Sequence, residues 1–392
     1  MADFPRVVLH KRKVDAVKRF HPWIFSGALQ QIAPEVEEGD IVDVYSVSGE
    51  YLATGHYATG SIAVKVLSFQ PVASLEQLFL QRFQSAFALR KQLGLAGSDR
   101  TTCYRLVNAE GDGLPGLIVD WYQGAAVVQA YSVGMVRQLD LICQCLQTLY
   151  GKDLQTIYDK SAAVLGKQHR DISHLLGDQT QGEVLEHGHR FAVNWEEGQK
   201  TGFFLDQREN RQMLSQYVQG KRVLNTFCYS GGFSVYAIQA GASLVHSVDS
   251  SAKAIAWTEQ NVALNNPNQI PHRAIAGDVF EFLKNCEPDY DVIVLDPPAF
   301  AKGLSARHAA VMAYKRLNRL AFDKLRPGGI VFTFSCSQVV TPDLFQGAVM
   351  AGAIESGRQI RVLNHLAQPG DHPVSIYHPE GLYLKGLVLA QE

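Results

Sequence analysis

One stretch near the middle of the chain, residues 222–240, most constrains the fold. A short apolar run over 223–227 predicts a buried strand, and Tyr-Ser-Gly-Gly over 229–232 predicts a tight turn before an apolar, helix-compatible segment. A strand, a glycine turn and a helix in this order bring backbone N–H groups to a ligand at the helix N-terminus. The same pattern also occurs as an ordinary joint of α/β proteins, because glycine-rich turns serve packing too.

From about residue 200 onward, strand patterns alternate with helical patterns, which is typical of a doubly wound sheet. Residues 252–264 and 314–325 have the apolar spacing of amphipathic helices. The predicted strands are 223–227, 244–248, 272–276, 292–295, 330–334, 360–363 and 382–389. The fold class predicted for this part is α/β.

The first 200 residues have a different pattern. Several short alternating strands before residue 72 predict a small β-barrel, and residues 73–197 predict a mixed α+β region in which we find no conventional catalytic cluster. Six basic side chains against two acidic ones in residues 1–30 indicate a local basic surface, although the net charge is only −2. That surface is either a nucleic-acid contact or a solvated helix face.

Composition excludes several classes of protein. No apolar run reaches about 18 residues and the N-terminus lacks a signal pattern, so we expect a cytoplasmic protein without membrane contact. The six cysteines show no C-x-x-C spacing and no nearby histidine cluster, which indicates free thiols and no metal site.

Chemistry-bearing side chains follow four of the predicted strands. Asp249, Asp278, Asp296 and Cys336 each come at or just after a strand end, where ligands of such sheets bind. The chain lacks both G-x-G-x-x-G and a Gly-Lys-Ser/Thr phosphate loop, so a nucleoside without phosphates fits better. These features point to S-adenosylmethionine, with Asp249 on the ribose hydroxyls and Asp278 accepting from the adenine amino group.

Several motifs together identify a family resemblance over nearly the whole length. They are His21-Pro-Trp-Ile-Phe-Ser-Gly27, Asp112-Gly-Leu-Pro-Gly-Leu-Ile-Val-Asp120, Lys200-Thr-Gly-Phe-Phe-Leu-Asp-Gln-Arg208, Asn225-Thr-Phe-Cys-Tyr-Ser-Gly-Gly-Phe233, Asp296-Pro-Pro and Phe334-Ser-Cys-Ser337. With them the chain resembles the bacterial large-subunit (23S) ribosomal RNA cytosine-5 methyltransferases that carry an N-terminal PUA domain. The resemblance implies a PUA-like RNA-binding domain over 1–72, a central α+β domain over 73–197 and a Rossmann-like class I methyltransferase domain over 198–392.

The resemblance also implies roles for particular residues. Gln207 and Arg208 are expected to help hold the methionine part of the cofactor, with Arg208 as a partner for its carboxylate. Asn225 stands where the usual acid of the first strand would be, which puts that contact in doubt. The full set expected to bind the cofactor is Gln207, Arg208, Asn225, Phe227, Tyr229, Ser230, Gly231, Gly232, Asp249 and Asp278.

Methylation at C5 of cytosine needs nucleophilic help, because that carbon is a poor nucleophile. A thiolate that adds to C6 makes C5 reactive, and removal of the C5 proton later expels the enzyme. Cys336 is the predicted nucleophile, and its rival Cys228 lies in the turn against the cofactor. The removal of the C5 proton, which releases the enzyme, is assigned to Asp296 or to water.

Two other functions stay open. Asp296-Pro-Pro-Ala-Phe300 resembles the loop of enzymes that methylate exocyclic amines of guanine or adenine, although the aromatic residue comes one position late. A non-catalytic ribosome-assembly factor is the third hypothesis, and the intact set of strand-end residues argues against it. A homodimer is expected from the resemblance alone, and the modified nucleotide cannot be deduced.

Overall fold

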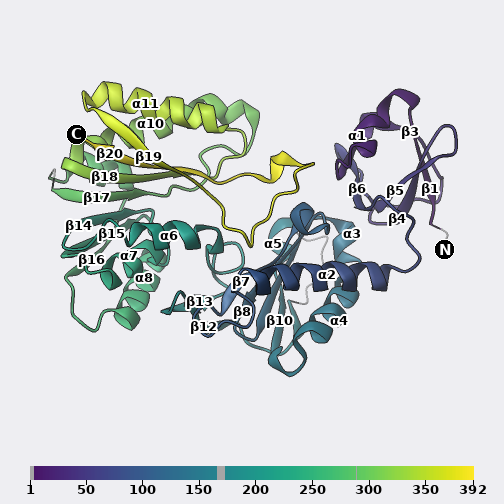
Figure 1. Ribbon diagram of the computed structural model, residues 1–392, viewed down its shortest axis with the longest axis horizontal. Helices are drawn as coiled ribbons and strands as arrows, with labels where there is room; N and C mark the ends of the chain where they lie inside the picture. Colours follow the sequence, from purple (N-terminus) through teal and green to yellow (C-terminus); the bar gives the residue numbers. More distant parts are fainter. Residues whose placement is uncertain (1–3, 166–172, 288) are drawn as a thin grey trace. The chain divides into compact units, whose positions relative to one another are not determined.

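The computed structural model describes residues 4–165, 173–287 and 289–392, and its contacts divide the chain into two compact units (Figure 1). Unit 1 comprises Met1–Val184, Val193–Leu205 and Gly370–Gly381. Unit 2 comprises Leu185–Ala192, Asp206–Pro369 and Leu382–Glu392.

Unit 1 begins with a small six-stranded sheet in the order β2-β6-β5-β4-β1-β3, in which only the β1–β4 pair is parallel. Alternating valines of its strands, among them Val7, Val44 and Val64, are fully buried and form a core of their own. This confirms that the region folds from several short strands, while closure of these strands into the predicted small β-barrel stays a prediction. Its strands are β1 (Arg6–Leu9), β2 (Trp23–Phe25), β3 (Leu29–Ile32), β4 (Ile41–Ser46), β5 (Tyr51–Tyr57) and β6 (Ile62–Ser68); its helical turns are η1 (Lys11–Lys13), α1 (Asp15–Lys18) and η2 (Ser26–Ala28).

The second part of unit 1 is a five-stranded sheet, β11-β10-β9-β8-β7, packed against α2 and α4. Ser74 caps α2 by accepting from Gln77 N, and Phe79 and Phe83 are its buried face. Helices α3 and α4 are separate, because Gln138 between them leaves helical geometry (φ −102°, ψ 11°). The elements are α2 (Leu75–Gln92), β7 (Cys103–Asn108), η3 (Ala109–Asp112), β8 (Leu117–Tyr122), β9 (Ala125–Ala130), α3 (Val133–Val136), α4 (Leu139–Tyr150), η4 (Gly151–Asp153), β10 (Thr156–Asp159), α5 (Ala162–Leu165) and β11 (His174–Leu176).

A segment from near the C-terminus, residues 370–381, completes unit 1. Asp371 is buried there: its carbonyl oxygen accepts from Arg90 Nη2 at 2.6 Å, and its Oδ2 accepts from the backbone N–H of Arg105 at 3.0 Å. Two residues later, Pro373 O accepts from Asn108 Nδ2 at 2.9 Å. These bonds tie the segment to the central sheet.

Unit 2 contains a seven-stranded sheet in the order β16-β15-β14-β17-β18-β20-β19, parallel except for β20, which is antiparallel to both neighbours. The strand order reverses between β14 and β17, and such a switch point opens a crevice at the carboxyl ends of the strands. The strands are β14 (Arg222–Thr226), β15 (Leu244–Asp249), β16 (His272–Ala276), β17 (Tyr290–Leu295), β18 (Leu325–Ser335), β19 (Ile360–Ala367) and β20 (Lys385–Gln391). All seven predicted strands are confirmed.

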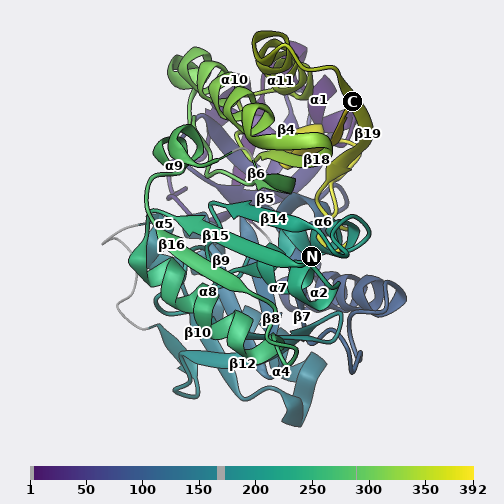
Figure 2. The same ribbon diagram turned by 90° about the vertical axis from the view of Figure 1, so that its left-hand side faces the viewer.

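Helices cover this sheet in two groups. Helices α7 and α8 pack on each other and on β14 and β15, whereas α10, with α11 alongside, packs on β17 and β18 (Figures 1 and 2). The helices are α6 (Arg208–Leu214), α7 (Gly232–Gln239), α8 (Ala252–Asn265), α9 (Val279–Asn285), α10 (Arg307–Lys324) and α11 (Pro342–Ser356), with short turns η6 (Leu205–Gln207) and η7 (Leu304–Ala306). The turn η8 (Pro379–Gly381) belongs to the segment of unit 1. The doubly wound α/β class predicted from the strand–helix alternation is therefore confirmed.

A separate hairpin, β12 (Gln181–Glu186) and β13 (His189–Asn194), turns at His187 and Gly188. Within the described ranges, no helix is long and apolar enough to cross a membrane.

Candidate functional site at the strand ends of unit 2

The turn after β14 is a strained backbone segment. Phe227 (φ 54°) and Tyr229 (φ 48°) both have left-handed φ, which is rare for bulky residues and costs about 1–3 kcal/mol each. Gly231 (φ 78°) follows, and a Cβ there would lie 2.9 Å from Cγ2 of Thr258 on α8. Strain of this kind concentrates at ligand sites, and the close approach of α8 explains why glycine is needed.

Neighbouring side chains hold the same turn in place. Asn261 Nδ2 donates to the Ser230 carbonyl oxygen at 2.9 Å. A Cβ on Gly232 would lie 3.0 Å from Cδ of Arg211, whose guanidinium is buried and bound by both carboxylate oxygens of Glu186 at 2.8 and 2.7 Å. The turn thus rests on two fixed helices, α6 and α8.

The acid at the end of β15 is fixed by backbone donors. Asp249 is half-buried; its Oδ2 accepts from Tyr229 N at 3.0 Å and its Oδ1 from Ser251 N at 2.9 Å. Asp278 is exposed and caps α9, since its Oδ1 accepts from Glu281 N at 2.9 Å. Both acids lie at the carboxyl edge of the sheet, as expected for strand-end residues.

Asn225 is buried in the last part of β14. Its Nδ2 donates to Ser234 Oγ at 2.8 Å, and hydroxyl contacts of 2.7 and 2.8 Å continue through Ser247 to His272 Nε2. Burial lowers the pKa of His272 to about 4, so its imidazole is neutral at pH 7. Within the described part of the chain, Asn225 Oδ1 is a buried acceptor without a hydrogen-bond partner. An unsatisfied buried acceptor at such a position is available to a donor on a ligand.

The start of α6 meets the end of β17. Gln207 Nε2 donates to Asp296 Oδ1 at 2.9 Å, and Gln207 Oε1 accepts from Asn210 Nδ2 at 2.6 Å. Arg208 is almost fully buried and its Nε donates to Glu209 Oε1 at 3.1 Å. The structure therefore brings Gln207 and Asp296 into direct contact.

Cys336 follows the last residue of β18 and is partly exposed. Because Leu295 and Thr333 are register partners on adjacent parallel strands, the segments that carry Asp296 and Cys336 leave the sheet at the same edge. Next to the cysteine, the Ser337 carbonyl oxygen accepts from Lys385 Nζ at 2.7 Å.

Two ionisable groups interact with Cys336. Burial lowers the pKa of Lys385 to about 8, while the charge of Cys336 acts in the opposite direction and raises it. Burial raises the pKa of Tyr314, and the charge of Cys336 raises it further. Tyr314 OH also contacts Ser337 Oγ at 3.0 Å. Lys385 is thus a cation beside the thiol.

Other cysteines lie in environments that disfavour a thiolate. Burial raises the pKa of Cys228 to about 12 and that of Cys143 and Cys145 to about 11. Cys228 Sγ lies 3.4 Å from Thr258 Oγ1, inside the packed side of the glycine turn. A cysteine so buried is a poor nucleophile.

Sequence reasoning missed Lys385, Tyr314 and Asn210. For Lys385 a signal existed: it is the one charged residue in the apolar run Leu382–Leu389. For the other two no pattern in the sequence distinguishes them from ordinary helix residues.

Comparisons with known proteins agree with this geometry. A family model described as S-adenosylmethionine-dependent methyltransferase matches residues 104–377, and one described as PUA-like domain matches residues 7–69. Ribosomal RNA large subunit methyltransferase I of Aeromonas hydrophila is 39% identical, over 98% of each chain. The protein of the same name from Escherichia coli K12 is 38% identical, over 97% of this chain and 98% of its own.

A solved structure extends the match to a bound cofactor product. A protein described as a methyltransferase complexed with SAH superposes with a TM-score of 0.83 at 26% identity, over 98% of this chain and 99% of that chain. The chain therefore belongs to the S-adenosylmethionine-dependent methyltransferases, in the family whose curated members are called ribosomal RNA large subunit methyltransferase I.

Proposed function

We propose that this enzyme methylates C5 of a cytosine in large-subunit (23S) ribosomal RNA through a covalent bond between Cys336 and C6. The names of the relatives support ribosomal RNA as the substrate. The observation that carries the choice of atom is the partly exposed Cys336 thiol beside the Lys385 ammonium at the sheet edge. A cation next to a thiol favours the reactive thiolate.

The strand-end residues fit S-adenosylmethionine. Asn225 Oδ1, which has no hydrogen-bond partner among the described residues, suits an ammonium donor. Asp249, held by two backbone N–H groups, suits the two ribose hydroxyls. The residues we assign to the cofactor are Gln207, Arg208, Asn225, Phe227, Tyr229, Ser230, Gly231, Gly232, Asp249 and Asp278. When bound, the cofactor supplies an electrophilic methyl group on a sulfonium.

Protein groups perform the remaining chemistry. The Cys336 thiolate forms a bond to C6 of the cytosine, and the electron pair of the C5–C6 double bond becomes available at C5. Once C5 carries the methyl group, a base removes its proton, the C5–C6 double bond forms again and the S–C6 bond breaks. Asp296 is the candidate base, or holds a water that acts as one, because Gln207 fixes its carboxylate from one side.

The arrangement around Phe300 disfavours methylation of an exocyclic amine. That reaction uses an aromatic ring after the Asp-Pro-Pro segment to stack on the base. Phe300 instead packs in a protein cluster, with ring centroids 4.8 Å from Tyr314, 6.2 Å from Phe280 and 6.5 Å from Phe227. These contacts make Phe300 part of the protein's own aromatic cluster, although the residue stays partly exposed.

Replacement of the nucleophile tests the proposal. We expect Cys336→Ala to lower the methylation rate of 23S rRNA by roughly 10⁴-fold, as for other nucleophile deletions, while S-adenosylmethionine still binds. Cys286→Ser, which changes a thiol directly after the C-terminal end of α9, is the matched control. Nucleoside mass spectrometry of the wild-type product should show 5-methylcytidine. Near-normal turnover of Cys336→Ala, or an N-methylated base, would refute the covalent mechanism.

We further propose domain boundaries after residues 72 and 197. The matched PUA-like region, residues 7–69, would then be the RNA-binding domain. Cytoplasmic location and a homodimer stay predictions.

A further inference from the structure

Unit 1 contains a cavity of about 810 Å³ that the methyltransferase chemistry does not use. Its walls come from the end of α1, the end of β6, helix α2 and the segment 370–381. The volume is in the range of ligand pockets. The lining residues that matter below are Phe20, Phe69, Arg82 and Tyr377.

Phe20 occupies a position that favours glycine. It follows α1 in a helix-ending motif, in which Phe20 N donates to Val17 O at 2.9 Å and His21 N donates to Ala16 O at 3.0 Å. Its φ is +65°, the left-handed conformation that glycine usually supplies at this point. The ring is also 46% exposed, so burial does not account for it. A strained residue with an exposed aromatic ring indicates a function for that ring.

Two further rings extend this exposed aromatic surface. The Phe20 ring centroid lies 5.3 Å from Phe69, edge-on, and 5.3 Å from Tyr377, tilted. Tyr377 is 52% exposed. Aromatic side chains at the rim of a cavity are what proteins use to stack unpaired bases of single-stranded RNA.

The charges around the cavity suit an anionic polymer. Arg82 Nη2 donates to Leu67 O at 3.3 Å, and within the described ranges its buried Nε has no hydrogen-bond partner. Two acids that also line the cavity are already paired: Asp112 binds Arg90, and Glu110 Oε1 accepts from Trp23 Nε1 at 2.8 Å. The adjoining segment adds exposed cations at Lys11, Arg12, Lys13, Lys18 and Arg19.

We propose that this cavity binds an unpaired base of the RNA substrate, with Phe20 and Tyr377 stacking on it and Arg82 donating to the base or its phosphate. The proposal rests on the proposed action on ribosomal RNA and adds a recognition site separate from the strand-end chemistry. RNA is favoured over a protein segment because the cations flank stacked rings that suit planar bases.

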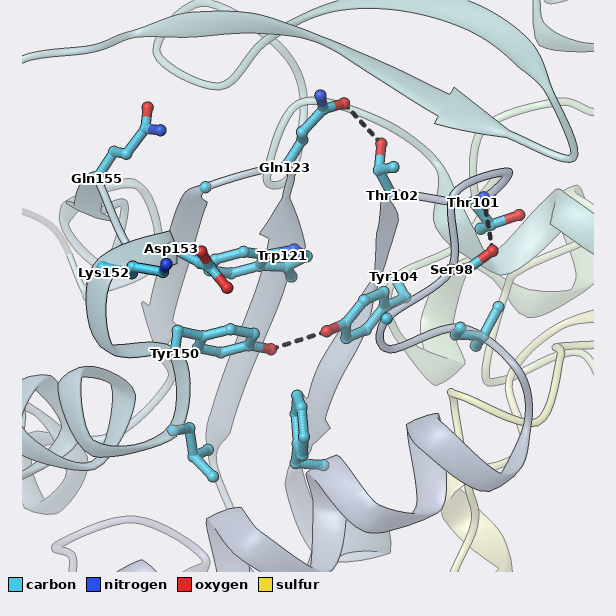
Figure 3. A pocket seen from close by; sticks show the side chains of 15 residues that line it. Ser98, Thr101, Thr102, Tyr104, Trp121, Gln123, Tyr150, Lys152, Asp153 and Gln155 are labelled. Carbon is cyan, nitrogen blue, oxygen red and sulfur yellow. Dashed lines mark hydrogen bonds between the residues drawn. The ribbon is translucent and has the colours of Figure 1, made fainter.

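A second cavity of unit 1, of about 430 Å³, shows the contrast (Figure 3). There Trp121 and Tyr150 stack on each other with centroids 3.8 Å apart and planes 4° apart. The Tyr150 hydroxyl points to that of Tyr104, at 3.0 Å, and Thr102 donates to Gln123 Oε1 at 2.9 Å. Its stacked rings and these hydroxyl groups are paired with one another, so we assign no ligand to it.

Phe20→Gly separates a binding role from a structural one. Glycine suits the left-handed backbone, so the variant should melt at the wild-type temperature or higher. Loss of the ring should raise the Kd for a fluorescent 23S rRNA fragment roughly tenfold. Tyr377→Ala should act in the same direction, and Phe20→Trp should bind like wild type.

Two controls make the experiment specific. Phe25→Ala removes another exposed ring, from β2, that does not line the cavity, and Tyr150→Phe alters the second cavity; neither should change the Kd. Unchanged RNA binding by Phe20→Gly, a clear drop in its melting temperature, or an equal loss for Phe25→Ala would overturn the proposal. So would weaker binding to large-subunit particles with unchanged binding to naked RNA, which would indicate a protein contact. Failure of the wild type to methylate rRNA would instead refute the proposed function, because the RNA-binding comparison does not depend on turnover.

Discussion

The central sheet of unit 1 and the strand ends of unit 2 treat their charged side chains in opposite ways. In unit 1, Asp120 is buried and bound bidentately by Arg105 at 2.8 and 2.9 Å, and the charges cancel inside the protein. In unit 2, Asp249 is held by backbone N–H groups, and Lys385 lies beside the partly exposed Cys336 at the sheet edge. The difference teaches that a buried acid by itself indicates little about function. A strand-end acid that is held by backbone N–H groups, as Asp249 is, can still accept hydrogen bonds from a ligand.

The largest expected effect on stability concerns the buried Asp120–Arg105 pair of unit 1. Asp120→Ala leaves the Arg105 guanidinium buried without its counter-charge, so the free energy of unfolding should fall by about 3–5 kcal/mol. Denaturant titration followed by tryptophan fluorescence measures this, because Trp23, Trp121 and Trp195 all belong to unit 1.

The matched control is Glu50→Gln in the exposed Lys18–Glu50 pair of the same unit, which should cost about 1 kcal/mol or less. A similar loss of stability in both variants would show that the buried Asp120–Arg105 pair contributes no more than an exposed ion pair.

The next effect tests the open edge of unit 2. Asp249→Asn keeps an oxygen for only one of the two backbone donors and removes the charge that we assign to the ribose, so Kd for S-adenosylmethionine should rise about 10–100-fold. Trp257 provides the readout, since its ring centroid lies 5.6 Å from that of Tyr229 in the turn. Glu259→Gln, on the exposed side of α8, is the control. An unchanged Kd would show that Asp249 shapes the turn and does not bind the cofactor.

A pH experiment tests a buried, neutral imidazole of unit 1. Burial, with a smaller contribution from the charge of Lys65, lowers the pKa of His56 in unit 1 to about 3. The unfolded chain takes up this proton below about pH 6.5 and the folded chain does not. Stability is therefore full above pH 6.5 and lost as the pH falls toward 3, by up to about 1.4 kcal/mol per pH unit. Denaturation of His56→Asn at pH 7.5 and 5.5 should show a smaller loss than wild type; equal losses would exclude His56 as the cause.

The smallest effect concerns Lys385. We expect Lys385→Met to slow alkylation of Cys336 by iodoacetamide at pH 7 about tenfold, equivalent to one unit of thiol pKa, and Lys385→Arg to preserve the rate. The Lys385 pKa of about 8 means that its charge is present at pH 7 and fades above pH 8, so the two profiles should converge in alkali. Mass spectrometry of the Cys336 peptide, with Cys286 as an internal reference, measures both rates. Superimposed profiles would show that Lys385 does not influence the thiol.

Much of unit 2 was predictable because its signals are local. An apolar run followed by Gly231 and Gly232 is sufficient to predict a strand and a turn, and acids after strands predict an edge where ligands bind. The contact between Gln207 and Asp296 joins residues 89 apart and depends on how α6 meets β17. No spacing in the sequence encodes it.

Unit 1 was less predictable for a related reason. Phe20 looks like any aromatic residue in the sequence, and only its backbone angle and exposure distinguish it. The assignment of residues 370–381 to this unit depends on Arg90 and Arg105, which donate hydrogen bonds to Asp371 across a sequence separation of 266 residues or more. Such pairings are decided by the tertiary structure.

That late segment has a consequence for biosynthesis. A chain that emerges from the ribosome N-terminus first has made both arginines long before it makes Asp371. Unit 1 therefore cannot complete its hydrogen bonds until almost all of unit 2 has been translated. Separate expression of the two halves, split at any single peptide bond between residues 206 and 369, would leave the first half without its closing segment. Because the sequence of unit 2 interrupts that of unit 1, the order of translation sets when unit 1 can finish folding.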